Sequence, residues 1–265
     1  MPTFRDLHQR SNPFILANAW DAGSAKMLAG LGAQAIATSS GAHAFTLGRP
    51  DMGTITRDEA LSHAQELIRA VNIPVSGDFE NGFGDAPDVC AQTVRLAGEI
   101  GLAGICIEDV ALPETTAYDH DLAVERIRAA ASAARALPND FVLVARADGV
   151  MNGRYDLDEA IKRIIAYEAA GADCVYIPAP ASMIDLARIC AATTLPVNAL
   201  AAGKFAKVSR AQFAAIGVAR ISLGAALARM THRIIHDAAH AMFQDGDFNG
   251  LTNILPTDQL EKLLG

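Results

Sequence analysis

Eight short runs of apolar, β-type residues alternate with helical patterns along this 265-residue chain. Most runs are nearly continuous in Val, Ile, Leu and Ala, as expected of parallel strands that are covered on both faces. Repeated β–α units of this kind predict a parallel sheet flanked by helices. The eight predicted strands are Pro13–Trp20, Ala33–Ser40, Ile73–Glu80, Ala103–Val110, Phe141–Asp148, Ala172–Ala179, Leu195–Ala201 and Val218–Gly224.

The segments between these runs carry helix signals. Thr56–Asn72 opens with Thr56-Arg-Asp-Glu59, which matches the capping-box pattern. Leu122–Leu137 and Asp156–Ala170 have helical periodicity. Several helices are expected to end at a glycine just before the next strand, because glycine tolerates the left-handed backbone of the C′ position. These glycines are Gly32, Gly101, Gly171 and Gly217.

Eight β–α units within one domain length predict an α/β fold of the closed (β/α)₈ type, a TIM barrel. An open doubly wound sheet is the alternative, but no Gly-rich dinucleotide fingerprint follows the first strand. No linker or low-complexity tract is visible, so we expect residues 1–265 to form a single domain with a C-terminal helical tail. The last helical stretch, Ala225–Asp245, precedes apolar residues that need a surface on their own barrel or on a neighbouring subunit.

Charge and composition exclude several classes of partner. The net charge of -8 argues against nucleic-acid binding, which depends on Lys and Arg at phosphates. No apolar run reaches membrane-spanning length and no signal region opens the chain, so we expect no membrane partner and a cytoplasmic location. The four cysteines form no CxxC pair and are predicted to be buried free thiols.

Polar residues collect where the predicted strands end, which is where barrel active sites form. Asp78 and Glu80 close the third strand, and their spacing of two predicts that they point to the same side. Glu108 closes the fourth strand. An oxygen-only set without a matching His or Cys suits Mg²⁺ or Mn²⁺. The alternative is a structural network in which Arg146 neutralises these carboxylates.

Two further features suit an anionic substrate. Arg146 interrupts the apolar fifth strand, and a guanidinium there can hold a carboxylate or phosphoryl group with two parallel bonds. Ser39-Ser40-Gly41-Ala42 follows the second strand, where N–H groups and hydroxyls can cradle an oxyanion, although Ser-Ser-Gly is common in ordinary turns. His232, His236 and His240 lie far from the predicted barrel mouth in sequence, so we expect a helix face or subunit contact there.

Taken together and in order, six motifs resemble the isocitrate lyase/phosphoenolpyruvate mutase superfamily over nearly the whole chain. The resemblance implies a (β/α)₈ barrel whose last helix is exchanged between subunits of a homo-oligomer, a tetramer or a dimer. The motifs are Asn18-Ala-Trp-Asp-Ala-Gly-Ser24, Thr38-Ser-Ser-Gly41, Leu47-Gly-Arg-Pro-Asp-Met-Gly53, Gly77-Asp-Phe-Glu-Asn-Gly-Phe-Gly84, Gly104-Ile-Cys-Ile-Glu-Asp109 and Val144-Ala-Arg-Ala-Asp148.

The resemblance also implies site roles. Asp78 binds Mg²⁺ directly, while Glu80 and Glu108 help to hold the ion through water. Asp51 matches an acidic residue at the rim of the site, and with Glu108 and Arg146 it makes up the implied catalytic group. The implied substrate-binding residues are Ser40, Gly41 and Ala42, which match a carboxylate-binding loop, together with Arg146 and Asn198.

One region departs from the better known branches. Isocitrate and methylisocitrate lyases carry Lys-Lys-Cys-Gly-His after the fourth strand, whereas this chain has no Cys, His or Lys between Glu108 and Thr116. The Lys and Asn of the mutase and phosphonopyruvate hydrolase branches are absent there too. Glu80 replaces the usual aspartate, and Pro178 stands where lyases often carry a glutamate. The sequence thus resembles the branch that includes oxaloacetate decarboxylation and cleavage of substituted malates.

We therefore expect a Mg²⁺-dependent lyase or decarboxylase that cleaves a C–C bond in a small 2-oxo or 2-hydroxy di- or tricarboxylate. The reaction would pass through a pyruvate enolate, and CO₂ can leave without a dedicated protein base. Two alternatives remain open: a phosphonopyruvate-type P–C hydrolase or mutase, and a non-catalytic carboxylate-binding protein.

Overall fold

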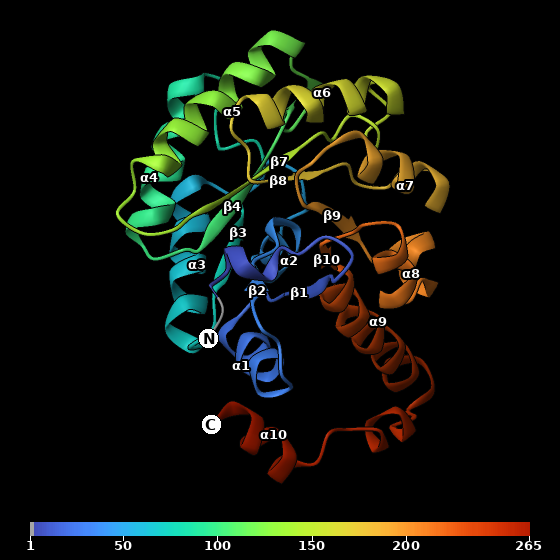
Figure 1. Cartoon of the computed structure of the whole chain (residues 1–265). Coiled ribbons are helices and arrows are strands. Elements are labelled where there is room, and N and C mark those ends of the chain that lie inside the picture. The colour runs from blue at the N-terminus through green and yellow to red at the C-terminus, as the bar shows by residue number, and fades with distance from the viewer. Residues whose placement is uncertain (1–2) are drawn as a thin grey trace.

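The computed structural model describes residues 3–265 and shows a closed barrel of parallel strands surrounded by helices (Figure 1). Around the barrel the strands follow the order β1-β10-β9-β8-β7-β4-β3-β2. Each lies within one of the eight predicted runs, so the TIM barrel is confirmed and the open sheet is excluded. The strands are β1 (Phe14–Asn18), β2 (Ile36–Ala37), β3 (Val75–Asp78), β4 (Gly104–Glu108), β7 (Val142–Arg146), β8 (Cys174–Tyr176), β9 (Val197–Leu200) and β10 (Arg220–Ser222).

Helices follow the strands and cover the outside of the barrel (Figure 1). Thr56 and Glu59 form the predicted capping box, and the four predicted C′ glycines have φ values of +97°, +94°, +101° and +94°. The helices are α1 (Ala22–Gly30), α2 (Ser40–Thr46), α3 (Arg57–Ala70), α4 (Pro87–Glu99), α5 (His120–Arg135), α6 (Leu157–Ala169), α7 (Met183–Ala192), α8 (Arg210–Ala215), α9 (Ala226–His240) and α10 (Thr257–Leu264).

Two apolar layers hold the barrel together. The larger one lies between strands and helices, and the smaller one fills the barrel interior with residues such as Leu16, Val144 and Tyr176. All four cysteines are buried and free, as predicted. Among residues 3–265, no helix combines the length and the apolar character that crossing a membrane requires.

A short antiparallel hairpin interrupts the regular alternation after β4. It consists of β5 (Val110–Ala111) and β6 (Thr116–Ala117), and we call Val110–Ala117 the rim hairpin. Arg154 holds its tip by donating hydrogen bonds to the carbonyl oxygens of Thr115, at 2.7 Å, and Glu114, at 2.9 Å. Sequence patterns did not predict this hairpin, because its strands are only two residues long.

The C-terminal segment runs away from the barrel along α9 and returns below α1 (Figure 1). Here α10 packs on α1 of the same chain, and Lys26 Nζ donates a hydrogen bond to the Leu264 carbonyl at 2.7 Å. The apolar tail therefore finds a surface on its own barrel, one of the two alternatives stated above. Exchange of the helix between subunits stays a prediction, for which the exposed side chains of Ile234, Phe243 and Ile254 provide apolar surface.

Candidate active site

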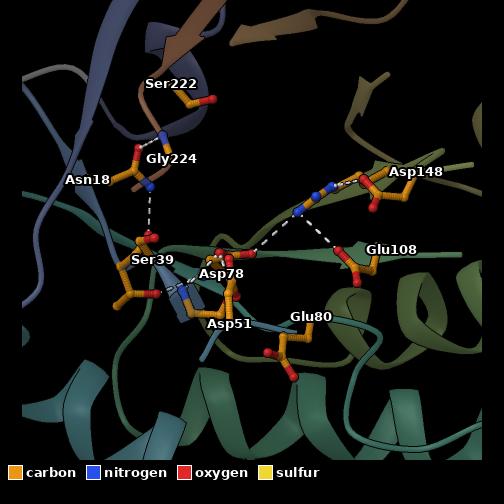
Figure 2. A network of polar contacts seen from close by, with 12 residues as sticks. Asn18, Ser39, Asp51, Asp78, Glu80, Glu108, Asp148, Ser222 and Gly224 are labelled. Atoms are coloured by element: carbon orange, nitrogen blue, oxygen red, sulfur yellow. Dashed lines mark hydrogen bonds and ion pairs between the residues drawn. The ribbon is translucent and has the colours of Figure 1, made fainter. Parts of the chain in front are cut away.

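A cavity of about 970 Å³ lies at the carboxyl ends of the barrel strands. It gathers the predicted acidic residues and the arginine from separate elements, with β3, β4 and β7 each contributing a terminal side chain. Figure 2 shows the acidic side chains grouped around this space. The location agrees with the general position of active sites in barrels of this type. The predicted residues that line it are Ser40, Gly41, Asp51, Asp78, Glu80, Glu108 and Arg146.

Asp78 is held in place from two directions. Its backbone N–H donates to Thr38 Oγ1 at 2.8 Å, and its Oδ2 accepts from both the backbone N–H and the hydroxyl of Ser40 at 2.9 Å. Ser40 is the first residue of α2, so the positive end of that helix faces the carboxylate. Asp78 Oδ1 lies 3.8 Å from Arg146 Nη1. One carboxylate oxygen is thus committed to α2, and the other faces the centre of the cavity.

Glu80 reaches the same cavity for a reason other than the predicted one. Strand β3 ends at Asp78, and Glu80 sits in the following turn with φ +46°, a left-handed conformation that is costly for a non-glycine residue. The turn is held by a 2.9 Å hydrogen bond from Glu108 N–H to the Glu80 carbonyl. Burial raises the pKa of Glu80 to about 7; the N–H of Gly53, 3.1 Å from Oε1, opposes the rise, and Asp78 adds to it.

Glu108 and Arg146 form the buried centre of the site. Glu108 Oε2 accepts from Arg146 Nη1 at 3.0 Å, whereas Glu108 Oε1 is sealed from solvent without any partner in residues 3–265. Burial raises the pKa of Glu108 well above its usual range, and the Arg146 charge opposes that rise. Arg146 Nε also donates to Asp148. Arg146 therefore does neutralise carboxylates, as the structural alternative proposed, while its guanidinium still lines the cavity.

The donor set suits a hard cation. Four carboxylates line the cavity; Arg146 pairs with Asp78 and Glu108, whereas Asp51 and Glu80 form no ion pair among residues 3–265. The orphaned Glu108 Oε1 also calls for a positive partner. Within residues 3–265, no three Asp, Glu, His or Cys side chains already converge tightly enough to enclose an ion. The residues therefore fit an ion that keeps part of its water shell, as Mg²⁺ usually does.

Two predicted substrate-binding residues lie off the cavity wall. Ala42 is buried behind it, with its N–H donating to Ser39 Oγ at 3.2 Å, and Ser39 lines the cavity instead. Asn198 is buried in β9, where its Nδ2 donates to Ser222 Oγ at 2.9 Å. The second-strand loop thus presents Ser39, Ser40 and Gly41 rather than residues 40–42.

Helix α9 forms one wall of the cavity, which the sequence did not lead us to expect. His232 and His236 line the cavity together with Arg229 and Arg233, so the helix face that we expected for these histidines borders the barrel mouth, although it is far from the mouth in sequence. The reason is that α9 starts four residues after β10, so its first turns border the mouth before the helix leads away from the barrel. The sequence does contain a signal for this wall: Arg229, His232, Arg233 and His236 are spaced three or four residues apart, which places them on one face of a helix. A subunit contact there stays a prediction.

Asp109 follows Glu108 at the end of β4 and is held by several hydrogen bonds. It accepts hydrogen bonds from the hydroxyls of Tyr155 and Tyr167 and pairs with Arg163 Nη1 at 3.0 Å. Its Oδ1 also accepts from the Asp148 N–H at 2.8 Å. Both carboxylate oxygens are thus bonded and Asp109 does not line the cavity, so it serves to fix the ends of β4 and β7.

The rim hairpin places an apolar residue over the cavity. Leu112 lines it, and no His, Cys or Lys of residues 3–265 lines it from this hairpin. A Cβ on Gly53 would lie 2.9 Å from Leu112 Cβ, so the loop that carries Asp51 packs directly against the hairpin. The site is therefore covered from this side by Leu112 instead of an acid or base.

Comparisons with known proteins agree with this arrangement. The family model described as phosphoenolpyruvate phosphomutase matches residues 4–243. The 2,3-dimethylmalate lyase of Eubacterium barkeri is 32% identical over 225 residues, which cover 80% of this chain and 75% of the relative. The oxaloacetate decarboxylase of Chromohalobacter salexigens is 30% identical, with 81% of this chain and 75% of the relative covered.

A solved structure extends the agreement to the whole barrel. A protein from Burkholderia cenocepacia J2315, provisionally classed as a lyase or mutase, matches with a TM-score of 0.93 and 43% identity. The match covers 98% of this chain and 93% of that one. From these matches, the chain belongs to the phosphoenolpyruvate phosphomutase family.

Proposed function

We propose that this protein is a Mg²⁺- or Mn²⁺-dependent carbon–carbon lyase that acts on a small 2-oxo or 2-hydroxy di- or tricarboxylate. The preferred reaction is decarboxylation of an oxaloacetate-like substrate, or cleavage of a substituted malate, with a pyruvate enolate as intermediate. The observation that carries the proposal is the cavity in which Asp78, Glu80 and Glu108 face Arg146. The names of the two lyase relatives support the same class of reaction.

The substrate carboxylate would bind where the second-strand loop meets Arg146. Ser40 donates from both its backbone N–H and its hydroxyl to Asp78, which leaves Ser39 and Gly41 as the other residues of this loop that line the cavity. Arg146 can add charge-assisted hydrogen bonds from the opposite wall. Held this way, the 2-oxo group would lie against the carboxylate cluster.

Asp78, Glu80 and Glu108 would hold the metal ion, directly or through its water. When bound, Mg²⁺ supplies Lewis-acid stabilisation of the negative charge that develops on the 2-oxo oxygen. Asp51 covers the rim, where burial raises its pKa. Leu112 excludes water from the side of the rim hairpin and contributes no base, which suits a reaction whose leaving group is CO₂.

Assembly and location follow as further proposals. The exposed apolar side chains of the α9–α10 segment would be covered in a homo-oligomer, a tetramer or a dimer, by exchange of the last helix. Four unpaired thiols support a reducing compartment such as the cytoplasm.

A panel of 2-oxo acids and substituted malates tests the proposed function. Pyruvate release is followed with lactate dehydrogenase at roughly millimolar MgCl₂ and again after EDTA treatment. We expect metal-dependent pyruvate release from at least one dicarboxylate. Tight binding of oxalate with no turnover of any compound would favour the carboxylate-binding alternative instead.

A further inference from the structure

We propose that the hydroxyl of Tyr176 is the proton donor that converts the enolate intermediate into the released 2-oxo acid. This inference rests on the proposed lyase function and adds a catalytic residue to it. Tyr176 closes β8 and was not singled out by the sequence motifs, because it lies inside a run that reads as an ordinary buried strand.

The position of Tyr176 is suited to this role. It is paired in register with Arg146 on β7 and Asn198 on β9, and it lines the same cavity as the carboxylate cluster. The Arg146 guanidinium carbon lies 5.5 Å from the centre of its ring. Only 7% of the residue is exposed, so packing holds the ring in one place.

The hydrogen bonding of Tyr176 differs from that of the other three tyrosines. Tyr118 donates its hydroxyl proton to Asp85, while Tyr155 and Tyr167 donate theirs to Asp109. The Tyr176 hydroxyl donates to no protein acceptor among residues 3–265, and it is not one of the polar atoms sealed from solvent. A molecule bound in the cavity can therefore reach it.

The protonation state of Tyr176 also suits a proton donor. The rim hairpin contributes Leu112 and no acid, and the carboxylates of Asp78 and Glu108 are assigned to the metal and Arg146. Burial raises the pKa of Tyr176, so its hydroxyl keeps its proton at neutral pH, while the Arg146 charge opposes that rise. Arg146 would therefore stabilise the phenolate that exists briefly after proton transfer.

The step balances as follows for an oxaloacetate-like substrate. The bond between C3 and the leaving carboxylate breaks, CO₂ departs, and the electron pair forms the C2–C3 double bond of the enolate. The enolate electrons then take the proton from Tyr176 Oη, so a C3–H bond forms and the O–H bond breaks. Water that enters the open cavity returns a proton to the phenolate, and no oxidant or reductant is needed.

The test uses Tyr176→Phe, which keeps the ring against Arg146 and removes only the hydroxyl. Tyr118→Phe is the matched control, because its hydroxyl bonds to Asp85 away from the cavity. The first readout is the exchange of pyruvate methyl protons with D₂O, followed by NMR on the Mg²⁺-loaded proteins. Exchange requires proton transfer at C3 but no C–C cleavage, so it measures this role separately from lyase activity.

We expect Tyr176→Phe to slow methyl exchange and kcat by about 100-fold or more, the range of general acid–base catalysis, while Tyr118→Phe keeps both. The Kd of oxalate, measured by calorimetry with Mg²⁺, should change by less than about threefold, because the proposed role of the hydroxyl is to protonate carbon and not to bind the carboxylates. Wild-type exchange in Tyr176→Phe, or no exchange in the wild type, would overturn the proposal. A loss of oxalate affinity as large as the loss of exchange would also overturn it, by making Tyr176 a binding residue. If the wild type released pyruvate from a dicarboxylate but did not exchange the methyl protons of pyruvate, the Tyr176 proposal would be overturned and the lyase function would still be supported.

Discussion

Replacing Glu80 by Gln in the metal-free protein should stabilise the fold at pH 8 and leave it nearly unchanged at pH 4. The side chain is 5% exposed, and its carboxyl group shares the cavity with Asp78 and Asp51. Burial raises its pKa from 4.5 to about 7. Because the folded-state pKa lies above the unfolded one, the folded protein binds the extra proton between these values. Stability therefore falls as the pH rises from about 4.5 to about 7, and the penalty is complete above that range.

The magnitude follows from the same two values. A difference of about 2.5 between the pKa values, at about 1.4 kcal/mol each, corresponds to about 3 kcal/mol of unfolding free energy at pH 8. Glutamine has nearly the same shape and keeps an oxygen that can accept from the Gly53 N–H, so the substitution removes mainly the charge. The gain should shrink when Mg²⁺ is added, because the ion stabilises the wild-type carboxylate.

Urea unfolding in EDTA, repeated at intervals between about pH 4 and pH 8.5, measures this difference through the unfolding midpoint and the m-value. Glu99→Gln, on the exposed surface at the end of α4, is the matched control and should stay within about 0.5 kcal/mol of the wild type throughout. A Glu80→Gln protein that is less stable than the wild type by the same amount at every pH would refute the reasoning. That result would mean that the Glu80 carboxylate is not held against an unfavourable environment.

Three further substitutions test other parts of the site. Arg146→Lys loses the planar fork and should lower kcat/KM by about 10- to 100-fold in steady-state assays, which matches the value of charged hydrogen bonds; an unchanged value would exclude two-point binding. Gly41→Ala places a Cβ 2.2 Å from Asp51 Oδ2, so we expect a raised KM with an unchanged circular dichroism spectrum. Arg163→Met leaves the Asp109 carboxylate buried without its cation and should cost about 3–5 kcal/mol in urea unfolding; a loss under about 1 kcal/mol would contradict that.

The barrel itself was predictable from the sequence. Strands buried on both faces produce continuous apolar runs. Glycines such as Gly101 and Gly171 mark helix ends because the backbone there is left-handed, a conformation that glycine adopts without strain. What pattern reasoning missed is short or non-periodic. The two-residue strands of the rim hairpin carry no period, and α9 reaches the cavity through its direction in space, which sequence distance does not reveal.

The site was predictable in its residue types more than in its geometry. Asp78, Glu108 and Arg146 meet because the ends of neighbouring strands meet. Glu80 joins them through a turn with positive φ, which the two-residue strand period could not foresee. Asn198 is buried and its amide is bonded to Ser222 on the next strand, a side-chain contact that a sequence pattern does not encode.

The most direct test of the proposed lyase compares the wild type with Asp78→Asn. Pyruvate and CO₂ formation from oxaloacetate is measured for both proteins against a Mg²⁺ titration, after correction for the reaction that free metal catalyses. We expect saturable Mg²⁺-dependent turnover by the wild type and a loss of at least about 100-fold in Asp78→Asn, with the fold intact by circular dichroism. Full activity in Asp78→Asn, or wild-type turnover that persists in EDTA, would contradict the assignment of Asp78 and its neighbours to a metal-assisted lyase site.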